Sequence, residues 1–176
     1  FAFTIGYHFI FVPISIGVGM MLVFAERRYY KSGIPADRAA SSFWIKLFTA
    51  TFAIGVATGI TMEFAFGTNW AEYSRFVGNI FGAPLAAEGL VAFFLESTFL
   101  GLWIFGWNRL PKKVHLATLW LAVAGSIVSA FFIIAANSWM QHPVGVELID
   151  GRPVMTDIWA VLGNNTAIAA YTHTLF

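Results

Sequence analysis

The chain has 176 residues, of which 59% are apolar, 18% aromatic and only 11% charged, and its net charge is +1. Because an ordinary soluble domain is about 25% charged, this composition excludes a soluble domain and indicates a chain embedded in lipid, with no nucleic-acid partner. The sequence contains no cysteine, which excludes disulfides, thiolate nucleophiles, iron–sulfur clusters and Cys-bound zinc, so any metal site must use His, Met or carboxylate ligands.

Long windows with few charges predict the membrane spans, because a transmembrane helix needs about 20 mainly apolar residues. The expected spans are residues 1–25, 43–66, 84–107, 115–137 and 160–176. The last is only the start of a span, because the sequence stops within an apolar run. We therefore predict an all-α, polytopic transmembrane helix bundle with four complete spans and the start of a fifth. It forms a single transmembrane domain that is a fragment of a longer chain.

The basic residues predict how this bundle is oriented. Eight of the ten Lys and Arg residues fall in the first and third loops. By the positive-inside rule these loops face the cytoplasm, which places the N-terminus outside and makes the first, third and fifth spans run inward. Residues 67–81, with Trp70, Tyr73 and Arg75, have the amphipathic character of a segment that lies along the outer surface.

The ionisable residues that we take as functional candidates inside the predicted spans are His8, Glu88, Glu96 and His173. A charged side chain at mid-membrane costs roughly 2.5–3.5 kcal/mol on insertion scales, so such residues are functional candidates. The predicted orientation places His8, Glu88 and His173 in one outer layer on three different helices. Glu96 lies eight residues beyond Glu88, about 12 Å along a helix axis. We expect a cofactor or ion site near the outer face, and Glu88 and Glu96 could be two stations of a proton path.

Each candidate also has a structural alternative. A membrane histidine is often only hydrogen-bonded to a neighbouring helix, although neutral imidazole is also the commonest ligand of haem iron. A buried glutamate can likewise be a structural hydrogen-bonding group. His115 borders a basic loop and His142 lies in an outer loop, so both are expected at a surface or interface. The spacing Gly55-x-x-x-Gly59 predicts close packing of the second helix on a neighbour.

Three stretches of sequence carry a family resemblance: Tyr7-His8-Phe9 followed by Phe11-Val12-Pro13, the long block 55–110, and AANSWMQHPVG at 135–145. Together they resemble subunit I of the cytochrome bd quinol oxidases. The resemblance covers nearly the whole chain and leaves only residues 147–163 unplaced. It implies a haem-bearing subunit that oxidises quinol, reduces O2 to water and contributes to the proton gradient without a dedicated pump.

The resemblance also implies roles for individual residues. His8 matches an axial ligand of a high-spin haem, His173 matches a ligand of the low-spin haem b, and Glu88 matches the carboxylate beside the high-spin pair. Glu96 matches a proton-carrying group together with Ser97 and Ser129. Asn137 and the turn at 139–141 look structural, and the other ligands and the quinol loop would lie beyond residue 176.

The implied cofactors are low-spin haem b, high-spin haem b, and haem d or a further haem b in its place. The implied partners are menaquinol or ubiquinol, O2, a second oxidase subunit, small accessory subunits and membrane lipid. The implied location is the bacterial or archaeal cytoplasmic membrane. A cofactor-free, proton-coupled transporter, in which Glu88 and Glu96 relay protons, is the alternative from another class.

Overall fold

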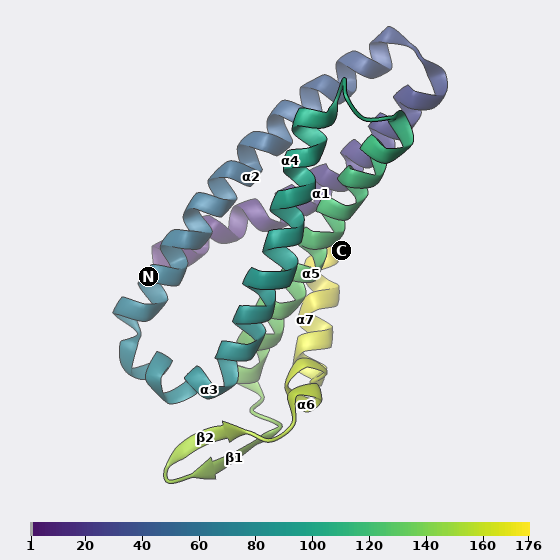
Figure 1. The fold of residues 1–176 in the computed structure, drawn as a ribbon. Coiled ribbons are helices and arrows are strands. Elements are labelled where there is room, and N and C mark those ends of the chain that lie inside the picture. The colour runs from purple at the N-terminus through teal and green to yellow at the C-terminus, as the bar shows by residue number, and fades with distance from the viewer. Residues whose placement is uncertain (1) are drawn as a thin grey trace.

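The computed structural model describes residues 2–176, so Phe1, where the first predicted span begins, lies outside the described residues. Its elements are α1 (Ala2–Ser32), α2 (Pro35–Asn69), α3 (Ala71–Ala87), the π-helical segment η1 (Glu88–Phe93), α4 (Phe94–Gly106), α5 (Lys112–Gln141), β1 (Val146–Ile149), β2 (Arg152–Met155), α6 (Ile158–Leu162) and α7 (Asn165–Leu175). The long helices lie alongside one another and the hairpin projects from one end (Figure 1).

Four helices are long and apolar enough to cross a membrane: α1, α2, the continuous helix Ala71–Gly106, and α5. The predicted helical membrane bundle is therefore confirmed. The turn between α1 and α2 lies at the same end of the bundle as the loop between α4 and α5 (Figure 1). These are the two basic loops, and α1, α4 and α7 all run toward that end. The sidedness in a membrane, with the N-terminus outside, remains a prediction from these charges.

The first two helices are longer than the apolar windows. Helix α1 continues to Ser32 and α2 begins at Pro35, because charged residues mark the end of the lipid core but do not end a helix, whose hydrogen bonds are made within the segment. The turn uses Gly33 at a φ of 65°, a left-handed conformation suited to glycine. Pro35 then occupies the first turn of α2, where its missing N–H is not needed.

The segment predicted to lie on the outer surface is largely helical. Only Trp70 separates α2 from α3, and α3 turns across the end of the bundle before α4 rises through it (Figure 1). One face of α3 packs on the end of α5 through a buried cluster that includes Val77, Ile80, Phe81 and Trp139. This packing fixes the direction in which the next helix enters the bundle.

The stretch that the sequence left unplaced forms a two-stranded antiparallel hairpin. Its two-residue turn is Asp150-Gly151, both with positive φ, which is the backbone that a tight hairpin turn requires. Helices α6 and α7 follow, capped by the side chains of Asp157 and Asn164. The predicted start of a fifth span at 160–176 is therefore divided, and its longer part begins at Asn165.

The core of the bundle is a buried apolar cluster that joins α1, α2, α4 and α5. Its members are Val18, Leu22, Val23, Phe48, Leu100, Trp103, Leu119, Ala122 and Val123. Helices α4 and α5 approach closely at Gly125, where an added Cβ would lie 2.8 Å from Glu96 Cβ and 2.9 Å from its Cα. Such a contact cannot be relieved by rotating a side chain, because one of the atoms belongs to the backbone.

Gly125→Ala should therefore push α4 and α5 apart. We expect a loss of about 1–3 kcal/mol, the usual cost of overpacking, seen as a lower thermal midpoint of the purified full-length protein in detergent. Gly101→Ala on α4 is the matched control, because an added Cβ there meets nothing within 4 Å. Equal midpoints for the two variants would contradict the close approach at Gly125.

Candidate functional site

His8 lies on the first helix and faces α2. Its side chain is half-buried, and its Nδ1 is 3.0 Å from the Thr58 hydroxyl. The ring packs on Gly59, where an added Cβ would lie 3.1 Å from His8 Cε1, and a Cβ on Gly55 would lie 3.6 Å from Phe11 Cβ. The close helix packing predicted for the Gly55 and Gly59 pair is thus confirmed, and the neighbour is the helix that carries His8.

Glu88 and Glu96 both reach serines on α5. The Ser129 hydroxyl donates to Glu88 Oε1 at 2.6 Å, and the Ser126 hydroxyl donates to Glu96 Oε1. Glu88 is half-buried, whereas Glu96 is only 8% exposed. Ser126 was not among the residues predicted from sequence, although two serines three residues apart in the charge-free part of α5 that follows Lys113 were a signal that could have found it.

The two carboxyl groups converge along the interface between the helices. Their positions differ by eight residues on one helix, whereas the serines that they meet are three residues apart, about 4.5 Å along the axis of α5. The π-helical segment η1 begins at Glu88 and ends three residues before Glu96, so it changes the helix register between the two carboxylates. Segments of this kind often occur at functional sites. The result is a row of four oxygen-bearing side chains at the contact of α4 and α5.

Ser97 does not join this row, because its hydroxyl donates to the Phe94 carbonyl of its own helix at 3.2 Å. His173 lies on α7 with an exposed side chain, and neither ring nitrogen has a hydrogen-bond partner within the described residues 2–176. The neighbouring Tyr171 anchors α7 by donating to the Ile127 carbonyl at 2.9 Å. The structure therefore places His8, Glu88 and His173 on three separate helices without direct contact among them.

A second polar cluster surrounds His115, which was predicted at a surface or interface. That prediction is wrong, because His115 is 0% exposed. Its Nδ1 is 2.7 Å from Glu26 Oε1, and the Trp103 indole N–H donates to Glu26 Oε2 at 2.7 Å. The position lies one turn inside α5, where α1 and α4 cover it. His142 is exposed, as expected, and lies 2.9 Å from the Asn165 side-chain oxygen.

The hydrogen bonds of this second cluster require a proton between Glu26 and His115. His115 Nε2 lies 2.8 Å from the Trp103 carbonyl, which can only accept, so Nε2 carries a hydrogen. A neutral ring then has no hydrogen on Nδ1. The short contact with Glu26 therefore needs a proton either on Nδ1, giving an ion pair, or on the carboxyl group. Tyr30 lies 2.9 Å from the same nitrogen.

Glu26 was also missed, because the first predicted span ends one residue before it, at residue 25. The signal was its spacing. The buried residues of α1 include Val18, Leu22, Val23 and Glu26, so Glu26 continues the buried stripe at helical intervals of three and four. An acidic residue on such a stripe needs a buried partner.

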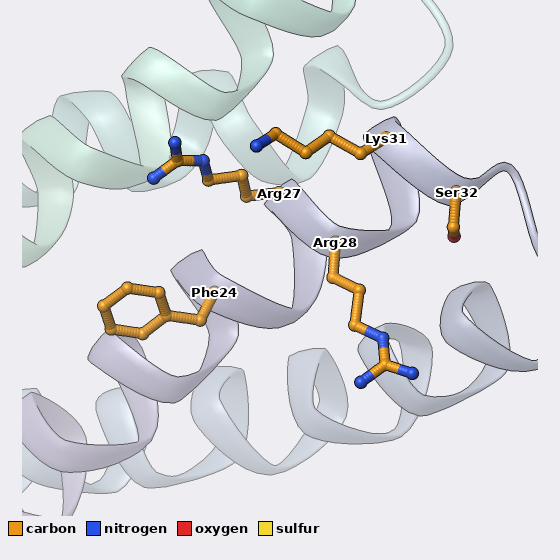
Figure 2. A pocket seen from close by; sticks show the side chains of 5 residues that line it. All are labelled: Phe24, Arg27, Arg28, Lys31 and Ser32. Atoms are coloured by element: carbon orange, nitrogen blue, oxygen red, sulfur yellow. The ribbon is translucent and has the colours of Figure 1, made fainter.

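A shallow pocket of about 380 Å³ lies on the surface near the C-terminal end of α1, the end that carries Glu26. It is lined by Phe24, Arg27, Arg28, Lys31 and Ser32, and the three basic side chains spread away from the helix (Figure 2). Arg28 Nε pairs with Asp37 at 3.1 Å. Phe24 is 16 residues from His8, about 24 Å along the axis, so this basic surface is separate from the histidine and carboxylate groups.

Comparison with known proteins identifies the family of the chain. The family described as "Cytochrome bd terminal oxidase subunit I" matches residues 1–176. The chain is 49% identical over its whole length to a Bacillus subtilis protein named "Cytochrome bd ubiquinol oxidase subunit 1" and covers 38% of that protein. It is 50% identical over 99% of its length to the Escherichia coli protein named "Cytochrome bd-II ubiquinol oxidase subunit 1" and covers 34% of it.

A solved structure agrees with the sequence comparisons. The bd oxidase from Geobacillus thermodenitrificans superposes with a TM-score of 0.89 at 30% identity, over 98% of this chain and 40% of that one. The chain belongs to the cytochrome bd oxidase subunit I family. It spans between a third and two fifths of the length of these relatives. The family resemblance found in the sequence is confirmed, and the alternative of a cofactor-free transporter has no support.

Membership in the cytochrome bd family implies haem, and the donor groups of this chain fit that cofactor. His8 has one ring nitrogen held by Thr58, and its other nitrogen, Nε2, has no hydrogen-bond partner within residues 2–176. Both nitrogens of His173 are likewise without one. A neutral imidazole with a free nitrogen is the donor that haem iron requires. Exposed apolar side chains of α1, Phe3, Tyr7 and Phe9, offer a nonpolar surface beside His8.

Removing one member of the buried Glu26–His115 pair should strongly destabilise this subunit I chain. Glu26→Gln keeps the size of the side chain but removes the carboxyl group that shares a proton with His115, and breaking a buried pair costs about 3–5 kcal/mol. We expect a clearly lower thermal midpoint of the full-length protein. Glu72→Gln, which breaks the exposed pair with Arg75, is the control and should leave the midpoint unchanged. A Glu26→Gln midpoint that matches this control would refute the role of the pair.

Proposed function

We propose that this chain forms part of the haem-bearing subunit of a quinol:oxygen oxidoreductase, a terminal oxidase that oxidises quinol and reduces O2 to water. The observation that carries the proposal is the row of two carboxylates and two serines between α4 and α5, in a chain that matches this family throughout. Acidic side chains inside a membrane bundle are costly. A row of them bonded to hydroxyl groups is suited to moving protons.

The proposed haem ligands are His8 and His173. His173 would hold a low-spin haem b that accepts electrons from quinol, and His8 would hold one of the two high-spin haems, haem b and either haem d or a further haem b, with Glu88 beside them. These groups supply the redox chemistry when bound. The protein contributes neutral imidazole nitrogens on separate helices and an apolar surround that keeps water from the iron.

Glu96, Ser126, Ser129 and Glu88 are proposed to carry protons to the site of oxygen reduction. Each serine hydroxyl donates to a carboxylate, and a hydroxyl can donate one proton while it accepts another. Protons would enter from the side of the basic loops and pass Glu96 before Glu88. Ser97 would join the path only after its hydroxyl rotates away from the Phe94 carbonyl.

The direction of the two half-reactions explains how the oxidase contributes to a proton gradient without a dedicated pump. Quinol oxidised near the outer face releases its protons outside, whereas the protons consumed in forming water come from the cytoplasm. The proposed partners are menaquinol or ubiquinol, O2, a second oxidase subunit, small accessory subunits and lipid. The proposed location is the cytoplasmic membrane of a bacterium or archaeon.

His173→Ala should remove the low-spin haem signal, because the imidazole nitrogen is the proposed donor to that iron. The measurement is the reduced-minus-oxidised absorption spectrum of the purified full-length oxidase. His142→Ala is the matched control, since His142 is also exposed and near α7 but, in the described part of the chain, its side chain bonds only to Asn165. A His173→Ala protein with an unchanged low-spin band would contradict the proposal.

Glu96→Gln should slow oxygen reduction by about 100-fold, because a positioned proton-transfer group typically contributes at least that factor. The amide keeps the hydrogen bond with Ser126 but cannot take up a proton. The measurement is the rate of O2 consumption with excess quinol, with haem spectra recorded on the same sample to check assembly. Glu147→Gln on the exposed hairpin strand is the control. An unchanged rate in a Glu96→Gln protein with full haem content would exclude Glu96 from the path.

A further inference from the structure

The hydroxyl group of Thr58 determines which nitrogen of the His8 ring carries the hydrogen. This hydroxyl donates along its own helix, with distances of 2.8 Å to the Ile54 carbonyl and 3.0 Å to the Gly55 carbonyl. A hydroxyl has a single hydrogen. The 2.8 Å contact with the Ile54 carbonyl is the shortest that this hydroxyl makes. With the hydrogen on that carbonyl, the Thr58 oxygen accepts from His8 Nδ1, which lies 3.0 Å away.

This arrangement selects one tautomer of His8. A hydroxyl oxygen that accepts from Nδ1 requires a hydrogen on that nitrogen. A neutral imidazole has one N–H, so the lone pair of the ring lies on Nε2, the nitrogen without a hydrogen-bond partner in residues 2–176.

Gly59 sets how closely the ring approaches α2. The position of an added Cβ would be 3.1 Å from Cε1, 3.6 Å from Nδ1 and 3.8 Å from Nε2. Contacts of about 3.1 Å are tighter than ordinary van der Waals packing, so a methyl group here would push the ring away from Thr58. A residue larger than glycine would thus weaken the hydrogen bond that selects the tautomer.

We infer that Thr58 and Gly59 are positioning residues that present Nε2 of His8 to haem iron. Thr58 keeps the hydrogen on Nδ1, and Gly59 leaves the space that lets the ring reach Thr58. A histidine that ligates a metal commonly donates its other N–H to an acceptor, which fixes the ring and strengthens its electron donation. The inference rests on the proposed role of His8 as a haem ligand.

The test compares substitutions of Thr58 in the full-length oxidase. Thr58→Val keeps the shape and removes the acceptor. We expect the haem held by His8 to dissociate about tenfold faster, within the usual range for loss of such a partner. We also expect its midpoint potential to rise, because the ring donates less electron density. Thr58→Ser should restore both values. Thr61→Val is the matched control on α2, because within residues 2–176 the Thr61 hydroxyl bonds only to the Ala57 carbonyl.

The low-spin haem provides an internal check of folding. A positioning defect should affect the high-spin signals and leave the low-spin band intact, whereas a folding defect would reduce both. Thr58→Ala is the second variant, since it removes the hydroxyl and cannot clash, and the same result is expected. If both variants keep the dissociation rate and potential of the Thr61→Val protein, the inference is overturned.

Gly59→Ala tests the space beside the ring independently. We expect the same faster haem loss, whereas Gly67→Ala on the same helix should not show it, because an added Cβ there meets nothing within 4 Å. Equal rates of haem loss from the two alanine variants would show that the space at Gly59 does not position the His8 ring.

His8→Ala separates this inference from the proposed function. If His8→Ala retains every haem signal, His8 is not a ligand and the proposed role itself fails. If His8→Ala loses the high-spin signal while Thr58→Val matches its control, only the positioning role fails.

Discussion

The close approach of α4 and α5 at Gly125 is the constraint on which the rest of this structure depends. Because Gly125 has no side chain, the backbone of Glu96 comes close to α5. The carboxyl groups of Glu96 and Glu88 can then meet Ser126 and Ser129. If the helices were further apart, the carboxylates would have no hydrogen-bond partners in an apolar bundle. An unpaired acidic side chain inside a membrane has a high free-energy cost. The packing of two helices therefore makes a row of acidic and hydroxyl groups possible where water is scarce.

Two polar clusters lie in the bundle, and an apolar core separates them. One contains the carboxylates and serines, and the other contains Glu26, His115 and Trp103. Leu100, Leu119 and Val123 are among the buried residues between them. Within residues 2–176, no polar groups connect the two clusters across this core. Glu26 and His115 therefore connect α1 to α5 near the basic loops, whereas the first cluster is the one that we propose carries protons.

The number of spans could be predicted from sequence because lipid requires long apolar windows, and the ionisable candidates could be predicted because such residues are costly there. The helix ends could not, because hydrogen bonds within a helix continue past charged residues such as Arg28. The hairpin was overlooked although Asp150-Gly151 is a strong turn signal. The hydrogen-bond partners across helices, such as Ser126 for Glu96 and Glu26 for His115, depend on how each helix is rotated about its own axis. The sequence pattern does not reveal this rotation, and the π-helical segment changes it between Glu88 and Glu96.

We propose that His8 and His173 hold haem iron on separate helices beside a row of proton-carrying groups. The most direct test is a cryo-electron microscopy structure of the full-length oxidase with its haems bound. We expect iron bonded to Nε2 of His8 and to a ring nitrogen of His173, with Nδ1 of His8 still facing Thr58. Haems ligated elsewhere, with both rings free of iron, would contradict it.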